Sequence, residues 1–309
     1  MKFRTIFAPG VALVCCLAVV ACSGASGSAK AEIPDSPDGT IKVVASELAN
    51  HRPQILWEAL PASYQQDISQ ITHDFAAKMD PELYNQLVAF AQKAVTVLLD
   101  KKELILGSSM VQLKEEDLAD IEQGWNTSLV ALDTLLHSEI SNIESLKTID
   151  LNAFLAGTGS ALMDQAAAAS KETPEDPFEN EVMARLHALQ VELLESDADT
   201  AKVKVSVPDE DSEELRMVRV EGRWIPAEMA ETWDKDVAEA KIKVAELSEE
   251  EMAQAKMQGM LFLAMADSFL DQLAAVQSSE EFDALAQGLL GGFMGGGTPP
   301  PPPQEITGG

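Results

Sequence analysis

The chain has 309 residues, of which 51 are acidic and 22 are basic, so its formal net charge is -29. Apolar residues make up 46% of it, which excludes the composition of a disordered chain and suffices for one large domain or two small ones. The negative charge excludes the extended basic surface that nucleic acids and anionic membranes require, so we expect no nucleic-acid partner.

The first 21 residues have the pattern of a secretory signal. Lys2 and Arg4 form a short positive region, and no residue from Thr5 to Cys22 is charged. The apolar run that follows is typical of the central part of an export signal. An uncleaved membrane anchor is the alternative, but a spanning helix needs about 20 apolar residues. The run is shorter than that and contains Pro9-Gly10.

The end of this run, Val19-Val20-Ala21-Cys22, resembles the lipobox of bacterial lipoproteins. The resemblance implies that the Cys22 thiol is acylated with diacylglycerol and that cleavage occurs just before it, so that covalent lipid anchors the protein to the membrane. Ser23 implies, by the same resemblance, passage to the outer membrane facing the periplasm in a Gram-negative cell. An ordinary signal peptide cut elsewhere is the alternative.

This interpretation accounts for all three cysteines. Cys15 and Cys16 leave with the signal, and Cys22 is consumed by lipid, so the mature protein has neither a thiol nor a disulfide. Loss of Lys2 and Arg4 with the signal changes the net charge from -29 to -31. We therefore expect an acidic exported domain that is held together by its hydrophobic core alone.

Composition divides the rest of the chain into three parts. Residues 22–40 are rich in Ser, Gly, Ala and Pro and predict a flexible tether. Residues 41–290 carry helical periodicity and predict one mainly α domain. Residues 291–309 contain a glycine run and five consecutive prolines, which predict a disordered tail. A ligand for a proline-binding groove is the alternative for this tail.

Apolar spacing in the first half of the domain predicts a series of helices. Their expected ranges are 41–51, 62–78, 81–101, 118–143 and 146–169. Asp80 and Pro81 fit an N-cap and a first helical position. Ser141 and Glu144 fit a capping box, which indicates a helix break near 141. Gly157 and Gly159 would interrupt the last of these helices.

The second half of the domain contains the β-structure. The helical spacing of Leu186, Leu189 and Leu193 predicts a helix that starts at Thr173-Pro174. Strict alternation over 201–207 then predicts a strand, and a charged turn precedes a second strand over 215–225. The apolar residues of this second strand change parity after Met217, which indicates a bulge or burial on both faces. The expected fold is a bundle-like, mainly α domain with one small antiparallel β-hairpin near 201–225.

Three more helices are expected after the hairpin, beginning at Pro226, at the capping box of Ser248 and Glu251, and at Ser278. The phrase from Val218 to Trp224 resembles the V-x-G-x-W hairpin of small export-associated α+β domains. Those domains have several further strands, whereas only two are predicted in this chain.

Candidate chemistry is sparse. The sequence contains no complete catalytic or nucleotide-binding motif, and Gly157-Thr158-Gly159-Ser160 is only a fragment of a phosphate loop. No two of the four histidines have the helical spacing of a metal pair. They are His51, His73, His137 and His187. We therefore expect no catalytic, cofactor-binding or metal residue, and Cys22 is the one modification site predicted.

Two further groups have alternative interpretations. Four methionines of one helix fit core or partner packing, and copper(I) binding through thioethers is the alternative. They are Met252, Met257, Met260 and Met265. The acidic run 209–214 fits a solvated turn, with weak divalent-cation binding as the alternative.

Two function hypotheses follow. The first is a non-enzymatic binding or scaffolding module, anchored at the cell envelope through lipid on Cys22, with an envelope protein as partner. The second is an envelope hydrolase whose site combines scattered acids with His73 or His187. An enzyme needs a cleft with convergent polar groups, whereas a binding module needs an exposed apolar patch. The 248–276 helix, apolar on more than one face, is the first candidate for such a patch.

Overall fold

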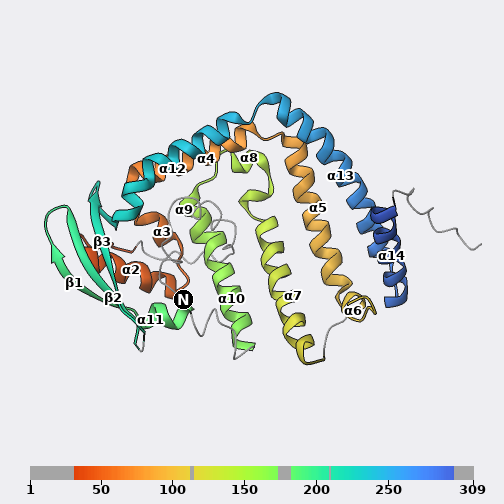
Figure 1. Ribbon diagram of the computed structural model, residues 1–309, viewed down its shortest axis with the longest axis horizontal. Helices are drawn as coiled ribbons and strands as arrows, with labels where there is room; N and C mark the ends of the chain where they lie inside the picture. Colours follow the sequence, from red (N-terminus) through yellow and green to blue (C-terminus); the bar gives the residue numbers. More distant parts are fainter. Residues whose placement is uncertain (1–30, 112–114, 173–181, 209, 296–309) are drawn as a thin grey trace, which may run out of the picture.

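A computed structural model describes residues 31–111, 115–172, 182–208 and 210–295 (Figure 1). The predicted signal, Cys22, the start of the tether and residues 296–309 lie outside the described residues. Helices dominate the described part, and one small antiparallel sheet lies at one end of the molecule while α14 lies at the other. The mainly α fold class predicted from the sequence is therefore confirmed.

The first described helix begins earlier than expected. α2 spans Pro37–Ala49, because the Ser36 hydroxyl accepts a hydrogen bond of 3.2 Å from the Gly39 amide and caps it. The helical part thus starts four residues before position 41. α3 spans Gln54–Glu58, and α4 spans Ala62–Lys78, the range predicted for it.

Four helices lie side by side in the order α10, α7, α5 and α13 (Figure 1). α5 spans Pro81–Asp100, and the Asp80 carboxylate caps it by accepting a hydrogen bond of 2.9 Å from the Leu83 amide. The predicted N-cap is therefore confirmed. α6, Lys102–Leu106, follows α5, and α7 spans Glu115–Leu136.

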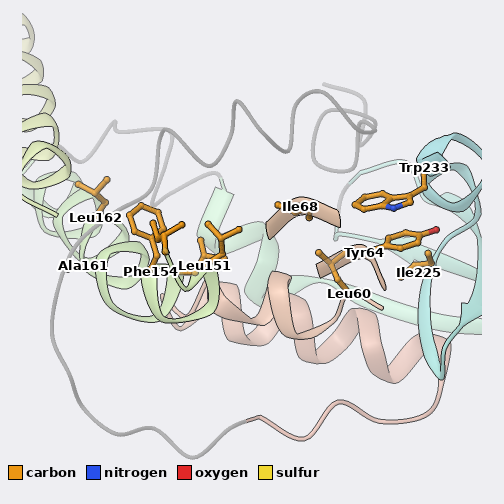
Figure 2. Packing of buried hydrophobic residues seen from close by; sticks show 11 residues of the cluster. Leu60, Tyr64, Ile68, Leu151, Phe154, Ala161, Leu162, Ile225 and Trp233 are labelled. Atoms are coloured by element: carbon orange, nitrogen blue, oxygen red, sulfur yellow. The ribbon is translucent and has the colours of Figure 1, made fainter. Parts of the chain in front are cut away.

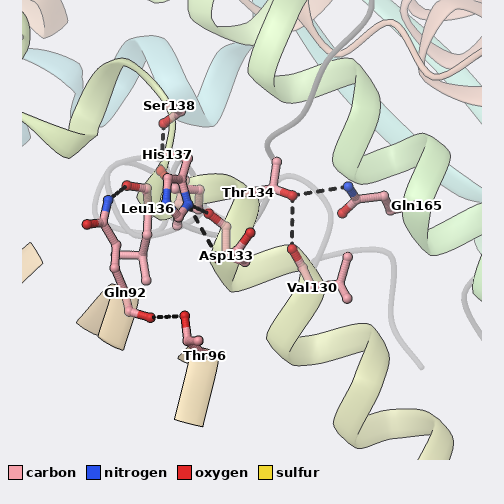
Figure 3. Close-up of polar contacts among 10 residues, drawn as sticks. Gln92, Thr96, Val130, Asp133, Thr134, Leu136, His137, Ser138 and Gln165 are labelled. Atoms are coloured by element: carbon pink, nitrogen blue, oxygen red, sulfur yellow. Dashed lines mark hydrogen bonds and ion pairs between the residues drawn. The ribbon is translucent and has the colours of Figure 1, made fainter. Parts of the chain in front are cut away.

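Side-chain amides tie this row of helices together (Figure 3). Gln92 of α5 donates a hydrogen bond of 2.7 Å to the carbonyl of Leu136, the last residue of α7. Gln165 of α10 donates one of 3.2 Å to the Thr134 hydroxyl of α7. Together with the hydrogen bond of 3.2 Å from the Trp125 indole of α7 to the Leu98 carbonyl of α5, these contacts join α10, α7 and α5.

The chain breaks after α7, close to the predicted position. A short 3₁₀ turn spans Glu139–Ser141, and α8 spans Ile143–Leu146. The cap of α8 is Asn142, whose side-chain oxygen accepts a hydrogen bond of 2.8 Å from the Glu144 amide. The predicted break is confirmed, but the predicted capping box of Ser141 and Glu144 is wrong, because the neighbouring amide side chain takes that role.

The segment with two glycines is continuous rather than broken. α9 spans Leu151–Phe154, a π-helical turn spans Leu155–Gly159, and α10 spans Ser160–Glu172. A Cβ on Gly159 would lie 2.8 Å from the Pro53 ring, so the absence of a side chain permits a close contact with the start of α3.

The sheet has four strands, in the order β1-β2-β3-β4 with every neighbouring pair antiparallel. β1 spans Gln190–Ser196 and β2 spans Thr200–Ser206. The helix predicted from Thr173 to Leu193 is wrong in its last part. α11 spans Ala184–Ala188, and Leu193 lies in β1. Thr173-Pro174 lies outside the described residues. Leu189, Val191 and Leu193 also alternate with period two, and pairing with β2 favours that period.

The second predicted strand is in fact two strands. β3 spans Glu213–Val220 and β4 spans Arg223–Pro226, joined by Glu221 and Gly222. Both turn residues have positive φ, at 50° and 77°, as a two-residue hairpin turn requires. The predicted β-structure over 201–225 is thus present and belongs to a larger sheet.

The parity change in β3 reflects burial on two faces. Met217 packs with Ile41 of α2 on one face, whereas Val218 and Val220 contact the helices on the other. β3 pairs with β2 without a register shift. The bulge lies in β1, between Leu193 and Glu195. Of the two alternatives for the parity change, two-sided burial is therefore confirmed.

Three helices complete the described chain. α12 spans Ala227–Glu246, α13 spans Glu249–Ala275 and α14 spans Ser279–Gly295. The capping box of Ser248 and Glu251 is present at the start of α13, as predicted. α14 includes residues 291–295, which were expected to belong to the tail.

The largest core cluster joins α4, α9, α10, α12 and β4 (Figure 2). The rings of Tyr64 and Trp233 stack within it, with centroids 3.8 Å apart and planes 3° from parallel. The indole nitrogen of Trp233 donates a hydrogen bond of 3.2 Å to Asp67, which also binds the Lys241 ammonium at 2.7 Å. A separate cluster joins α2 to the sheet.

None of the helices in the described ranges has the length and hydropathy needed to cross a bilayer.

Candidate functional site: the outer face of α13

The inner side of α13 is firmly packed against α5. Leu263, Leu270 and Leu273 are buried, and the last two form a cluster with Val97 of α5. Gly259 permits the close approach, because a Cβ at that position would lie 2.8 Å from a methyl group of Leu83. One side of the helix is therefore fully used in holding it to the molecule.

Two lysines fix the position of α13 along α5. Lys256 of α13 binds Asp80 at 3.1 Å and Glu82 at 2.7 Å. Lys93 of α5 binds two carboxylates of α13, at 2.6 and 2.8 Å. Hydrogen bonds from the Leu83 amide and from Lys256 hold the pKa of Asp80 below its usual value. Each lysine thus binds two carboxylates.

The outer side of α13 exposes large apolar side chains. Met257, Leu261 and Met265 follow one another at intervals of four residues, and Phe262 lies beside this row. Their exposed fractions are 68, 66, 64 and 63%, the highest of any large apolar residue in the described part of the chain. We call these four residues the α13 apolar face.

The α13 apolar face is also free of charge. Between Glu251 and Asp267, about four helical turns, the only charged residue is Lys256, and its ammonium is bound to acids of α5. The smaller side chains around the row are also uncharged; they are Ala253, Gln254, Gln258 and Ala264. In a chain of which 24% is charged, an apolar area of this kind is typical of a binding surface.

Acidic residues lie at both ends of this face. Glu249 and Glu250 are exposed in the first turn of α13, and Asp271 is exposed near its last turn. Glu251, by contrast, is engaged in the capping box, and hydrogen bonds from Ser248 hold its pKa below the usual value. The α13 apolar face is therefore an uncharged island in an acidic surrounding.

A second apolar feature lies at the other end of the molecule. A cavity of about 80 Å³ opens between α2, α3 and the β3–β4 hairpin. Its walls include Leu56, Leu215, Met217, Trp224 and Met229. The indole nitrogen of Trp224 is buried with no hydrogen-bond partner among the described residues.

Sequence reasoning did not find this cavity. Its walls come from residues 40–60 and from 215–229, which no local pattern connects.

The histidine and acid pairs considered from the sequence do not assemble into one site. His73 contacts the carbonyl of Ile149 at 3.2 Å, and Asp74 accepts a hydrogen bond of 2.7 Å from Gln70, so these two neighbours do not form an acid/base pair. His187 is exposed on α11, far along the chain from either. The hydrolase alternative thus gains no geometric support from these residues.

The other two histidines lie in separate places. His51 contacts the Asp164 carboxylate at 2.7 Å, and His137 contacts the Asp133 carbonyl of its own helix at 2.8 Å (Figure 3). Within the described residues, no group of three or more histidine, cysteine or acidic side chains has the arrangement of a metal site.

The methionines and the acidic turn also have ordinary environments. Met257 and Met265 face outward, whereas Met252 and Met260 are half-buried, so the four do not share one face. In the acidic turn, Glu214 binds Lys202 at 2.5 Å and Glu210 binds Arg185. Asp209 lies outside the described residues.

No protein-family model, curated protein sequence or solved structure matches the chain.

Proposed function

We propose that the protein is a lipid-anchored binding module of the cell envelope that holds a partner protein on the α13 apolar face. The observation that carries this proposal is the row of Met257, Leu261 and Met265, with Phe262 beside it, exposed by a helix whose opposite side is firmly packed. The anchor is Cys22, whose sequence context resembles a lipobox.

The energetics favour a partner on this face. Burying one large apolar side chain is worth about 1.5–3 kcal/mol, and a small cluster of such residues dominates the affinity of most interfaces. Methionine side chains are unbranched and adapt to different shapes, which suits a surface that receives another chain. Because α13 is fixed by Lys93 and Lys256, the face is already in place before a partner arrives.

Lipid on Cys22 would restrict where such a partner could be found. Thirteen residues lie between Cys22 and the helix cap Ser36, which limits the reach of this segment to about 50 Å. The domain would then search only a layer next to the membrane, which raises its effective concentration toward envelope proteins. A covalent anchor also removes the need for a membrane-binding surface on an acidic protein.

The anchor is tested by replacing the thiol. Cys22→Ala should abolish the labelling of the protein with a radioactive or clickable fatty acid in its host, while Cys15→Ala should leave the labelling unchanged. Labelled lipid on the Cys22 variant would overturn the anchoring proposal.

The binding role is tested by photo-crosslinking in the same cells. A photo-reactive amino acid in place of Gln258, between Met257 and Leu261, should give a discrete adduct that disappears when Leu261→Gln and Met265→Gln are added. The matched control places the same amino acid at Ala238, an exposed position of α12. Equal adducts at both positions, or none at Gln258, would contradict a binding role for the α13 apolar face.

A further inference from the structure

The charges around the α13 apolar face indicate the chemistry of its partner. Lys93 and Lys256 lie along the edge that α13 shares with α5, and the ammonium of each binds two carboxylates. Each lysine with its two acids therefore has a net charge of -1. Glu82 and Asp271, the outer acids of these sites, are well exposed. Glu249 and Glu250 add exposed charge at the start of the helix. The two lysines shared with α5 are thus neutralised. At the start of α13, Lys78 donates to the carbonyls of Ala245 and Leu247, and Glu249 with Glu250 outweighs its single charge, so the border of the apolar face is negative.

A second copy of the chain fits this border poorly. In an antiparallel pair centred on Leu261, the first turn of each helix would meet the last turn of the other, which brings Glu250 near Asp271 of the other copy. Like charges across an interface are repulsive, and each mature chain would carry a net charge of -31, since Lys2 and Arg4 leave with the signal. The row from Met257 to Met265 is also only about 12 Å long, whereas a stable dimer buries about 800 Å² on each partner.

We propose that the α13 apolar face binds a cationic amphipathic segment, a helix with apolar residues on one side and Lys or Arg at its borders. This inference rests on the proposed function and names the partner class for the same surface. Apolar residues of the segment would cover Leu261 and Phe262, and its basic residues would lie over Glu249, Glu250 and Asp271. Both contributions are needed, because the apolar contact provides most of the affinity and the charges select the partner.

The test uses three synthetic helical peptides of 18 residues with the same leucine pattern. The remaining positions are Lys in the first peptide, Gln in the second and Glu in the third. Binding to the full lipidated chain in phosphatidylcholine nanodiscs is measured by fluorescence anisotropy, with empty nanodiscs subtracted. We expect the Lys peptide to bind at least tenfold more tightly than the Gln peptide, and the Glu peptide not to bind. Raised salt should reduce this difference.

Variants assign the binding to α13. Leu261→Gln with Phe262→Gln should weaken the Lys peptide at least tenfold, and Glu249→Gln with Glu250→Gln should weaken it severalfold. The matched controls are Ile242→Gln, an exposed apolar residue of α12, and Glu192→Gln with Glu195→Gln on β1. Neither control should change the affinity.

The possible failures are distinguishable. If the Gln peptide binds as well as the Lys peptide and loses affinity in the Leu261 and Phe262 variant, the face is a binding site but its partner is not cationic. If the Lys peptide binds equally to all variants, the contact is a general charge attraction and the inference is overturned. A dimer that Leu261→Gln with Phe262→Gln dissociates in analytical ultracentrifugation would identify a second copy as the occupant and would also overturn it.

Discussion

Two consecutive helices, α12 and α13, each carry an aromatic residue, Trp233 and Phe262, and the two side chains differ in burial. Trp233 of α12 is buried, stacks on Tyr64 and donates a hydrogen bond to Asp67. Phe262 of α13 is largely exposed, although both helices begin at strong caps or prolines and carry apolar residues at helical spacing. Apolar spacing therefore locates a helix, whereas the elements packed against that helix determine whether its apolar side is buried in the core or exposed as a binding surface.

Removing the buried aromatic should have the largest effect on this comparison. Trp233→Ala takes away the ring that stacks on Tyr64 and leaves a cavity in the main core, so the free energy of unfolding should fall by about 3–5 kcal/mol. Trp233→Phe, which keeps an aromatic ring but loses the hydrogen bond, should cost less. Urea unfolding measures both. Equal losses would show that the bond to Asp67, rather than packing, dominates this contact.

A tight backbone contact should give the next largest effect. Gly159→Ala places a methyl group 2.8 Å from the rigid ring of Pro53, so overpacking should destabilise the protein by about 1–3 kcal/mol. The matched control is Gly157→Ala in the same π-helical turn, where a Cβ meets no atom within 4 Å. Thermal unfolding of the two variants compares them directly. If Gly159→Ala leaves the thermal stability unchanged, α3 and the π-helical turn can move apart without destabilising the protein.

The carboxylate next to Trp233 should make a smaller, pH-dependent contribution. Hydrogen bonds from Lys241 and Trp233 hold the pKa of Asp67 below its usual value. The folded state therefore binds this proton less tightly than the unfolded state, and the stabilisation is present above the unfolded pKa of about 4 and lost as pH falls through the folded one.

Asp67→Asn should accordingly cost about 1 kcal/mol at pH 7, since the site is partly exposed and screened. The cost should shrink below about pH 4. Unfolding at pH 7, 5 and 3 measures the trend, with the exposed Asp234→Asn on α12 as control. A cost that stays constant down to pH 3 would contradict the assigned ionic contact.

The smallest effect on stability is expected at the exposed aromatic. Phe262→Gln should change the free energy of unfolding by less than about 0.5 kcal/mol, because its ring lies mainly in solvent and glutamine is a good helix former. The same substitution is expected to weaken binding of the Lys peptide. Phe262 should therefore affect peptide affinity but not the stability of the fold. A loss of several kcal/mol would place Phe262 in the core and remove it from the α13 apolar face.

Local signals in the sequence predicted much of the helical fold. Asp80 and Ser248 begin helices because a side-chain oxygen satisfies an amide a few residues away, an interaction that the sequence alone contains. β1 was missed because Leu186, Leu189 and Leu193 fit a helix, and only pairing with β2 favours the strand. The cap of α8 was predicted one residue too early. Ser141 and Asn142 are adjacent polar residues that can each cap a helix, and only the structure shows that Asn142 does so.

The sequence predicted the helix that carries the candidate site, but it did not predict which side of that helix is exposed. Residues 248–276 are apolar around much of the helix, so the sequence alone did not distinguish the side that packs on α5 from the side that remains exposed. Gly259 and Lys256 make that distinction in the structure, because the first approaches Leu83 and the second binds acids of α5. Both contacts join positions more than 170 residues apart, beyond the range of any periodic pattern.

The carboxylate of Asp80 has two partners on two helices. One oxygen accepts the hydrogen bond from the Leu83 amide and completes the first turn of α5, while the other binds Lys256 of α13. A torque applied to α13 would pull the Lys256 ammonium away from Asp80 and weaken the hydrogen bond between Asp80 and the Leu83 amide at the start of α5. Strain on α13 would in this way be transmitted, through one shared carboxylate, to the first turn of α5.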